Sequence, residues 1–485
     1  MAFSIQELTV RLPMLGERTI GTVRKHDAPR PSNVTILIGR NGSGKSTILR
    51  DVIQILRPLG QLGRARAAAF SVLRLAMRRG ERAAIVEGGE VAERSEANVM
   101  PEAGNALPEK LIVLSFTPFD KFPVRDDLSD EEDTRSPFYV YLGFKTENGR
   151  SSVASRLLRT LDRLAFREHS ERADNGVANM LADIGYAPRI ELSFSLSPRV
   201  RDHLRKGISP SPAASRQMAE FEATGITGLF RPRRFDETID MLIDFETGEQ
   251  ELVLTRRAQV RRTRIVEPEE RIPLSGSLDG KMLARLVEIG ALKTASAIVT
   301  VQATGDMVDL LELSSGELSI ISGFLGLAVH LSDDCLVLID EPENSLHPAW
   351  QIKYVQMLDA AMKRFKGAHY FIATHSPLIV SGAASFDPVI LRLDLDPVTV
   401  DAGILADESP DATLVKAFDV VTHKNNFLRH LVLEGLTLIE TEQADTLRAR
   451  QIASLFNDLL PRIDHGDPVR DVIKAYVERV ADNVS

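Results

Sequence analysis

The stretch "NVTILIGRNGSGKSTILRDVIQIL", residues 33–56, decides the fold because it joins three elements in a fixed order. An apolar run ends at Ile38 and a glycine-rich loop follows. Apolar residues then recur at helical spacing, at Ile48, Leu49, Val52, Ile53 and Leu56. The pattern predicts a buried strand, a loop and an amphipathic helix. The loop "GRNGSGKS", Gly39–Ser46, fits the phosphate-loop pattern G-x-x-x-x-G-K-S/T in the context that this pattern requires.

The chemistry of phosphate binding accounts for the residues of this loop. Gly39, Gly42 and Gly44 allow backbone N–H groups to turn inward around phosphate oxygens, and the helix that begins near Lys45 adds its positive end. We expect the Lys45 amine to contact the β and γ phosphates and the Ser46 hydroxyl to ligate Mg²⁺. The alternative is a glycine turn with a chance lysine, which the strand and helix on either side argue against. The predicted nucleotide-binding residues are Gly39, Asn41, Gly42, Ser43, Gly44, Lys45, Ser46 and Thr47.

A second motif places two adjacent carboxylates after an apolar strand. In "LVLIDEPENSLHP", residues 336–348, the strand ends at Asp340 and Glu341 follows. Together with the phosphate loop, Asp340 matches the acid that binds the magnesium shell, and Glu341 is placed to polarise the attacking water as a general base. In isolation, the pair would be interpreted as a solvated strand end. Glu343 is interpreted as solvated or structural, and His347 as a loop-packing or dimer-contact residue.

A third motif, "LSSGE" at residues 313–317, predicts the start of a helix. Ser314 and Glu317 have capping-box spacing, so free N–H groups and the positive end of the helix dipole should face outward. Such a terminus can bind a γ-phosphate, although an ordinary helix cap has the same pattern. Its position shortly before the paired acids favours phosphate binding.

These motifs and "ATHSP", residues 373–377, occur in the order found in ABC-type P-loop ATPases. The chain resembles the SMC, RecF and OLD-like branch of that family, and it looks most like stand-alone anti-phage defence ATPases of the Septu or retron-associated type. The resemblance implies ATP and Mg²⁺ as cofactors and ATP hydrolysis as the activity. It also implies an active homodimer or higher oligomer, in which the signature helix of one chain closes over ATP bound to the other.

The resemblance also assigns roles to individual residues. Ser315 and Gly316 would serve the nucleotide of the partner subunit, and Ser345–Pro348 would lie at the D-loop of the dimer seam. His375 matches the switch histidine that senses the γ-phosphate. The implied catalytic residues are therefore Glu341, His375 and Lys45.

One segment departs from the family pattern. The family usually has a magnesium-contacting glutamine after the strand that follows the first helix, but "SFTPFDKFP", residues 115–123, has none. Asp120 is the nearest polar substitute as a metal ligand, beside Ser46 and Asp340. A plain turn residue is the equal alternative for Asp120.

At 485 residues the chain is too long for one ordinary core. We predict an α/β fold: an ABC-ATPase head with a mixed, largely parallel sheet around the phosphate loop, a mostly helical and partly basic insert, and a C-terminal helical extension. Apolar spacing in residues 152–166 and 281–295 suggests the helical insert, and the basic stretch 64–82 is interpreted as a helix with a solvated cationic face. The expected boundaries are 1–125 and 296–400 for the ATPase domain, 126–295 for the insert and 401–485 for the extension.

Composition narrows the environment and the partners. The net charge of −9 argues against a surface that coats polyanions, so any nucleic-acid contact would need local basic patches. The single cysteine, Cys335, excludes an intramolecular disulfide and a cysteine-rich zinc site, and it fits a reducing, cytoplasmic setting. No apolar run is long enough to span a membrane.

Two functions fit these patterns. The first is a dimeric ATP-driven switch that regulates a separate effector, such as an HNH nuclease or a toxin, in a bacterial anti-phage defence system. The alternative is a RecF- or SMC-like DNA-binding ATPase clamp in repair or recombination, whose insert neutralises nucleic-acid phosphates. The candidates for those contacts are Arg256, Arg257, Arg261 and Arg262.

Overall fold

The computed structural model divides the chain into two compact units. Unit 1 comprises Met1–Pro108, Leu338–Glu343 and His369–Ser485, and unit 2 comprises Glu109–Val337 and Asn344–Ala368. The residues that the structure describes are 2–24, 32–60, 71–87, 98–99, 106–124, 138–145, 157, 160, 171–206, 219, 222–223, 235–247, 249–258, 270–274, 280–396, 399–400, 409–421, 425–463 and 466–482.

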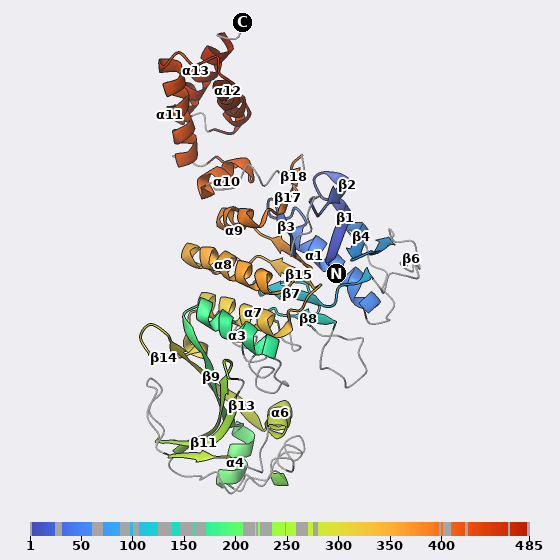
Figure 1. The fold of residues 1–485 in the computed structure, drawn as a ribbon, viewed down its shortest axis with the longest axis vertical. Coiled ribbons are helices and arrows are strands. Elements are labelled where there is room, and N and C mark those ends of the chain that lie inside the picture. The colour runs from blue at the N-terminus through green and yellow to red at the C-terminus, as the bar shows by residue number, and fades with distance from the viewer. Residues whose placement is uncertain are drawn as a thin grey trace. The chain divides into compact units, whose positions relative to one another are not determined.

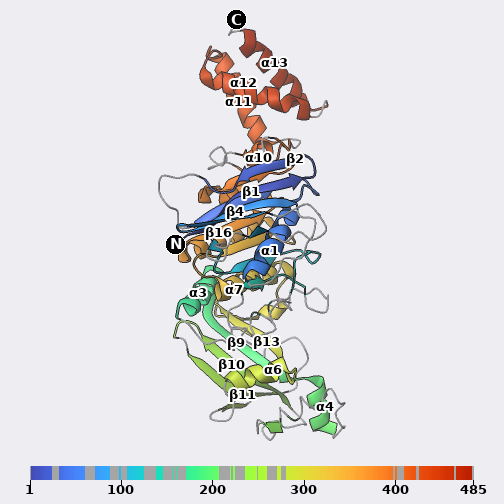
Figure 2. The same cartoon turned by 90° about the vertical axis from the view of Figure 1, so that its right-hand side faces the viewer.

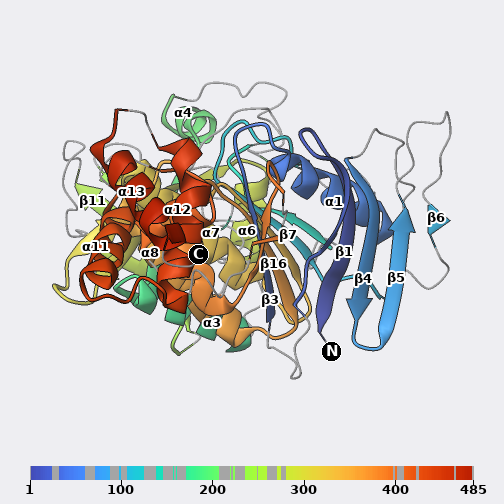
Figure 3. The ribbon, with the colours of Figure 1, turned by 90° about the horizontal axis from the view of Figure 1, so that it is seen from above.

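Unit 1 contains an antiparallel sheet of five strands in the order β2-β1-β4-β5-β6. The strand β1 (Phe3–Leu12) pairs with β2 (Gly16–Gly21) on one side and with β4 (Val72–Arg79) on the other. The strands β5 (Arg82–Glu87) and β6 (Asn98–Val99) extend the sheet beyond β4. Figures 2 and 3 show β1 and β4 side by side.

The described part of the basic stretch 64–82 forms β4 and the start of β5, so the predicted helix is wrong there. Leu75 and Met77 are buried, whereas Arg78 is exposed. This alternation is the period of two that a half-buried strand requires. The ladders to β1 and β5 also satisfy the backbone groups that a helix would have paired internally.

A seven-stranded sheet in the order β18-β17-β3-β16-β15-β7-β8 carries the phosphate loop. Its strands are β3 (Ser32–Ile38), β7 (Leu111–Ser115), β8 (Tyr139–Tyr141), β15 (Leu336–Asp340), β16 (Ala368–Ala373), β17 (Val389–Arg392) and β18 (Thr399–Val400). β17 runs parallel to β3 and β8 parallel to β7, whereas β18 is antiparallel to β17. Every residue of β7, β15 and β16 is buried, as the continuous apolar runs require. The predicted mixed, largely parallel sheet is confirmed.

Helix α1 (Lys45–Gly60) follows the phosphate loop in unit 1, and its apolar face is buried as predicted. Helices α9 (Pro377–Ala383) and α10 (Pro410–Lys416) lie in the same unit, and η4 (Ala384–Phe386) is a 3-10 turn after α9. Ser376 and Ser409 cap α9 and α10 at their N-termini.

The C-terminal extension is helical, as predicted. It contains α11 (Asn426–Glu440), α12 (Leu447–Leu459), the 3-10 turn η6 (Leu460–Arg462) and α13 (Pro468–Asp482), which Figure 1 shows gathered together. Their shared core includes Leu428, Leu431, Ile452, Phe456, Ile473 and Tyr476.

In unit 2, helices α3 (Glu171–Asp183), α7 (Ser315–His330) and α8 (Pro348–Arg364) lie side by side (Figure 1). Most of α7 is buried. The Tyr354 ring of α8 packs against Phe324 of α7, with centroids 5.1 Å apart, and against Phe116, with centroids 5.6 Å apart. These aromatic contacts join the helices to the end of β7.

The insert of unit 2 contains a six-stranded antiparallel sheet in the order β12-β11-β10-β9-β13-β14 (Figure 2). Its strands are β9 (Tyr186–Leu196), β10 (Phe235–Asp244), β11 (Gln250–Ala258), β12 (Glu270–Pro273), β13 (Leu292–Val301) and β14 (Met307–Asp309). The described helices that accompany it are α4 (Pro198–Lys206) and α6 (Gly280–Glu288), and the 3-10 turn η3 (Leu310–Glu312) follows β14.

The prediction of a mostly helical insert is therefore wrong for the described residues. The buried apolar residues occupy alternate positions of β9, at Ile190, Leu192 and Phe194, and of β10, at Ile239, Met241 and Ile243. The helix expected in 281–295 is confirmed only as far as Glu288, because the chain turns at Gly290, with φ of 72°, and continues as β13. Apart from 157 and 160, the stretch 152–166 lies outside the described residues. Within the described ranges, no helix combines the length and apolarity needed to cross a bilayer.

Candidate nucleotide-binding site

The phosphate loop joins β3 to α1 in a backbone conformation that favours glycine. Gly39, Gly42 and Gly44 have φ values of 143°, 81° and 103°. At Gly39, an added Cβ would lie 2.9 Å from Ser43 Oγ and 3.0 Å from Asp394 Oδ1. Position 39 therefore needs glycine for its backbone angle and for space.

Lys45 and Ser46 begin α1 at the end of this loop. The buried Lys45 amine donates to Gly39 O at 2.9 Å and to Arg40 O at 3.3 Å. The Ser46 hydroxyl donates to Asp340 Oδ1 at 2.8 Å, and Asp340 is 1% exposed at the end of β15. The structure thus brings the two predicted magnesium ligands of unit 1 into direct contact. Burial lowers the pKa of Lys45, and the charges of the neighbouring acids oppose this shift.

Glu341 follows Asp340 in a conformation that is uncommon for a residue with a side chain. Its φ is 50°, and its N–H donates to Ala373 O at 2.9 Å. Left-handed non-glycine residues persist only where the surrounding structure holds them, and they cluster at functional sites. Among the acids that raise the pKa of Lys45, Glu341 has the largest effect. Its carboxylate therefore lies within electrostatic reach of the phosphate-binding lysine.

His375 lies just beyond the end of β16. Burial and the nearby charge of Lys45 lower its pKa to about 4, while the charge of Asp394 opposes this shift. The imidazole is therefore neutral at pH 7 and has one donor and one acceptor nitrogen. Its backbone N–H donates to Glu343 Oε1 at 2.5 Å, and Thr374 Oγ1 donates to Glu343 Oε2 at 2.8 Å. Of the two interpretations given for Glu343, these contacts support a structural role.

Asp394, which follows β17, is a residue of the site that no motif indicated. Its Oδ2 accepts from Arg40 N at 3.1 Å and lies 3.7 Å from Arg40 Nε. The pKa values of Lys45 and His375 are both lowered, and the negative charge of Asp394 opposes the lowering in each case. The sequence did contain a pattern that could have indicated Asp394: the largely apolar run "VILRL" at 389–393 is followed directly by this acid, as the apolar run before Asp340 is.

The turn between β1 and β2 also borders the phosphate loop. A Cβ at Gly44 would lie 3.5 Å from Pro13 Cδ, and the adjacent Met14 is 61% exposed. No aromatic residue in the sequence had indicated a surface for a nucleotide base. The contact between Gly44 and Pro13 shows only that this turn lies against the loop.

The signature motif lies at the start of α7 in unit 2. Ser314 caps the helix: its hydroxyl accepts from Glu317 N at 3.4 Å, and its N–H donates to Glu317 Oε2 at 3.2 Å. The predicted capping box is confirmed, with Ser315 exposed and Gly316 buried. A Cβ at Gly316 would lie 2.8 Å from Ser345 O, so the signature motif packs directly on the D-loop.

Residues 341–347 connect β15 to α8, and the predicted D-loop, Ser345–Pro348, lies at the end of this connection. Ser345 has φ of 63°, and the Asn344 amide donates to Phe116 O at 2.9 Å. The exposed His347 is the N-cap of α8, where its Nδ1 accepts from Ala349 N at 3.3 Å. The hydrogen bond gives His347 a structural role at the start of α8.

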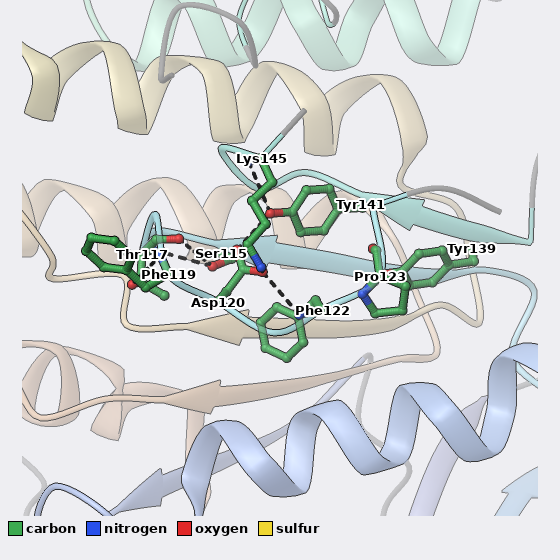
Figure 4. A network of polar contacts seen from close by, with 9 residues as sticks. All are labelled: Ser115, Thr117, Phe119, Asp120, Phe122, Pro123, Tyr139, Tyr141 and Lys145. Carbon is green, nitrogen blue, oxygen red and sulfur yellow. Dashed lines mark hydrogen bonds and ion pairs between the residues drawn. The ribbon is translucent and has the colours of Figure 1, made fainter. Parts of the chain in front are cut away.

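Asp120 lies in a network that leaves its carboxylate fully engaged (Figure 4). Its Oδ1 accepts from Phe122 N at 3.1 Å and from the Lys145 amine at 2.9 Å, and its Oδ2 accepts from the Tyr141 hydroxyl at 2.7 Å. The side chain of Asp120 is fully buried. These contacts do not support the predicted magnesium ligand, because the ammonium of Lys145 already neutralises the carboxylate. They favour the alternative given for Asp120, a structural turn residue.

Arg256, a predicted nucleic-acid contact, is buried and paired with two acids. Arg256 lies on β11 directly opposite Glu237 of β10, and it is 5% exposed. Its Nε lies 3.2 Å from Glu237 Oε1, and its Nη1 lies 2.7 Å from Glu270 Oε2. The charge of an arginine held between two acids is already neutralised, so the structure does not favour a nucleic-acid contact at Arg256. Arg257 belongs to β11, and Arg261 and Arg262 lie outside the described residues.

The residues of unit 1 fit a nucleotide phosphate with Mg²⁺. The Ser43 hydroxyl is buried in the loop, and within the described part of the chain it has no hydrogen-bond partner. An unpaired buried hydroxyl is costly, and a phosphate oxygen cradled by the loop would accept its hydrogen bond. Ser46 and Asp340 supply the hard oxygen ligands that Mg²⁺ prefers.

Comparison with known proteins gives a family match over part of the chain. The family described as "AAA domain, putative AbiEii toxin, Type IV TA system" matches residues 237–381, which include the signature motif, the paired acids and His375 but not the phosphate loop. No curated protein matches this chain.

Solved structures with similarity to the chain include SMC heads. The SMC head domain from Thermotoga maritima is 10% identical, with a TM-score of 0.32, over 80% of this chain and 94% of that one. An SMC head bound to the C-winged helix domain of ScpA has the same identity and coverage and a TM-score of 0.34. The head domain with an extended coiled coil bound to the C-terminal domain of ScpA, derived from Pyrococcus furiosus, is 11% identical over 82% of this chain and 95% of that one, with a TM-score of 0.29.

The phosphate loop on a largely parallel sheet and the Ser46–Asp340 contact form a candidate site in unit 1 for a nucleotide phosphate with Mg²⁺. The segment from residue 237 to 381 is similar to the AAA-domain family described above.

Proposed function

We propose that the protein binds and hydrolyses ATP as a dimeric switch, and that the switch regulates a separate effector, a nuclease or a toxin, in bacterial anti-phage defence. The observation that carries the proposal is the 2.8 Å contact between Ser46 Oγ and Asp340 Oδ1, beside the buried Lys45 amine. The contact joins the phosphate loop to the paired acids, as a magnesium-dependent phosphoryl-transfer site needs.

Each residue of the site has a defined task in this reaction. The loop N–H groups and the Lys45 amine would hold the β and γ phosphates, and Ser46 and Asp340 would hold Mg²⁺. The metal ion would supply positive charge that stabilises the phosphate oxygens. Glu341 accepts a proton from the attacking water. The neutral His375 would contact the γ-phosphate, so that the loop after β16 would respond to whether this phosphate is bound.

The dimer would complete the site by supplying a signature helix. Ser315 is exposed at the N-terminus of α7, where free N–H groups and the helix dipole favour an anion. A head-to-tail arrangement would place this terminus, with Gly316, over the γ-phosphate of the partner subunit. Hydrolysis would then remove the group that holds the two chains together.

The family description supports an effector of the toxin type, since its printed name joins an AAA domain with a putative toxin. A cytoplasmic location fits this role. The DNA-clamp alternative loses one of its proposed contacts, because Arg256 is buried between two acids.

Steady-state ATP hydrolysis tests the proposal. The wild-type chain should hydrolyse ATP, and Glu341→Gln should lower turnover by about 10²- to 10⁴-fold while ATP binding is retained. Lys45→Ala should weaken nucleotide binding itself. Equal turnover in wild type and Glu341→Gln would refute the base assignment, and the absence of ATP binding by the wild-type chain would refute the proposed function.

A further inference from the structure

We propose that Glu343 is a positioning residue for the switch histidine: its carboxylate fixes the backbone of Thr374 and His375 and thereby aims the His375 imidazole at the γ-phosphate. The inference rests on the proposed function, because it assigns a task within the same site.

Hydrogen bonds join the segment 340–343 to the segment 373–376 at both ends. At one end, Glu341 N donates to Ala373 O at 2.9 Å. At the other, the two carboxylate oxygens of Glu343 accept from His375 N at 2.5 Å and from Thr374 Oγ1 at 2.8 Å. The paired acids and the histidine loop are therefore held as one piece.

The hydroxyl of Thr374 extends this arrangement by one residue. It also accepts from Ser376 N at 3.0 Å, and Ser376 in turn is the N-cap of α9. The Glu343 carboxylate thus fixes the start of the turn, and the helix cap fixes its end. A single backbone conformation at His375 follows from both anchors.

The direction of the imidazole depends on this backbone. Within the part of the chain that the structure describes, the His375 ring makes no hydrogen bond. The hydrogen bond to Glu343 comes from the backbone N–H of His375. A side chain without a polar anchor takes its direction from the backbone and from packing. Loss of the Glu343 acceptors would therefore misplace the ring.

A charged carboxylate at position 343 is unfavourable unless hydrogen bonds from the histidine loop stabilise it, because the side chain is buried and lies near Glu341. Burial raises the pKa of Glu343, and the nearby charge of Glu341 acts in the same direction, whereas the hydrogen bonds from His375 and Thr374 oppose the shift. Burying one acid near another is costly, and the two donors of the histidine loop offset that cost.

Amide exchange in the nucleotide-free protein tests the contact without any catalysis. In protein labelled with ¹⁵N-histidine, the His375 signal is identified by its loss in His375→Gln. Its N–H should exchange about ten- to a hundredfold faster in Glu343→Ala, because a bond to a charged acceptor is lost. Glu343→Gln should give a smaller increase, because its amide oxygen remains an acceptor at about half the strength. Glu440→Gln, an exposed glutamate of α11, should leave the exchange unchanged.

ATP hydrolysis tests the consequence. Glu343→Ala should lower kcat by about 10²-fold, as expected for a misplaced catalytic group, with little change in ATP affinity. On a His375→Ala background, the same change should have no further effect, because both substitutions disable one unit. Unchanged exchange in both Glu343 variants, or independent losses in the double variant, would overturn the inference. Failure of the wild type to hydrolyse ATP would instead refute the proposed function, and the exchange result would still stand.

Discussion

Removal of the Asp120 carboxylate should destabilise the protein rather than disable its metal site. Asp120 is fully buried, and Asp120→Ala would leave three donors without their acceptor: the Lys145 amine, the Tyr141 hydroxyl and Phe122 N. Breaking a buried ion pair costs about 3–5 kcal/mol, and the low end applies because Lys145 is 23% exposed and regains water. A loss of about 3 kcal/mol corresponds to a fall in Tm of about 6–12 °C for a unit of this size.

Thermal unfolding followed by circular dichroism measures this loss. Tyr141→Phe removes only the bond to Oδ2 and should cost about 1–2 kcal/mol. Lys121→Met, at an exposed residue of the same loop, is the matched control and should leave Tm unchanged. If Asp120→Ala kept the wild-type Tm but raised the Mg²⁺ concentration needed for ATP hydrolysis, Asp120 would be a metal ligand and our reasoning would be wrong.

Three further predictions concern the nucleotide site and the signature motif. Gly39→Ala should lower nucleotide affinity at least about tenfold, measured by calorimetry, because its Cβ would lie 2.9 Å from Ser43 Oγ. Gly316→Ala should reduce ATP turnover and spare ATP affinity, because the new Cβ would lie 2.8 Å from Ser345 O and displace the signature motif from the D-loop. Equal losses of turnover and affinity would contradict this. The pKa of His375 is lowered to about 4 in the folded protein, against about 6.5 in the unfolded chain. The unfolded chain therefore binds this proton more tightly than the folded protein does. The stability that the group contributes falls as pH drops from about 6.5 towards 4. In His375→Gln, Tm should therefore decline less over that window.

The site was predictable from the sequence where its chemistry is local in the chain. The phosphate loop, the acids after β15 and the capping box of α7 each lie within one short motif, and the flanking elements form as expected. Asp394 could not be found in this way, because it reaches the phosphate loop only through the pairing of β17 with β3. The role of Glu343 likewise depends on the position of β16 beside β15.

The insert shows a different limit. Alternating apolar residues were present in "ELSFSL", residues 191–196, and in "TIDMLID", residues 238–244. The apolar spacing around 281–288 correctly predicted the helix α6, but α6 is one short element of an insert that is mainly a β-sheet. Long-range strand pairing decides which apolar faces are buried, and no single segment reveals its partner. The same limit hid the pairing of Arg256 with Glu237, since the two residues face each other only across two adjacent strands.

The mass of the Glu341→Gln protein, with and without ATP and Mg²⁺, tests the central claim most directly. ATP should convert the 53.5 kDa monomer to a species of twice that mass, and ADP should not. Ser315→Arg, which places a bulky side chain at the signature helix, should prevent the conversion without loss of ATP binding. A mass that stays at the monomer value with saturating ATP, or that is the same with and without nucleotide, would contradict an ATP-driven dimeric switch.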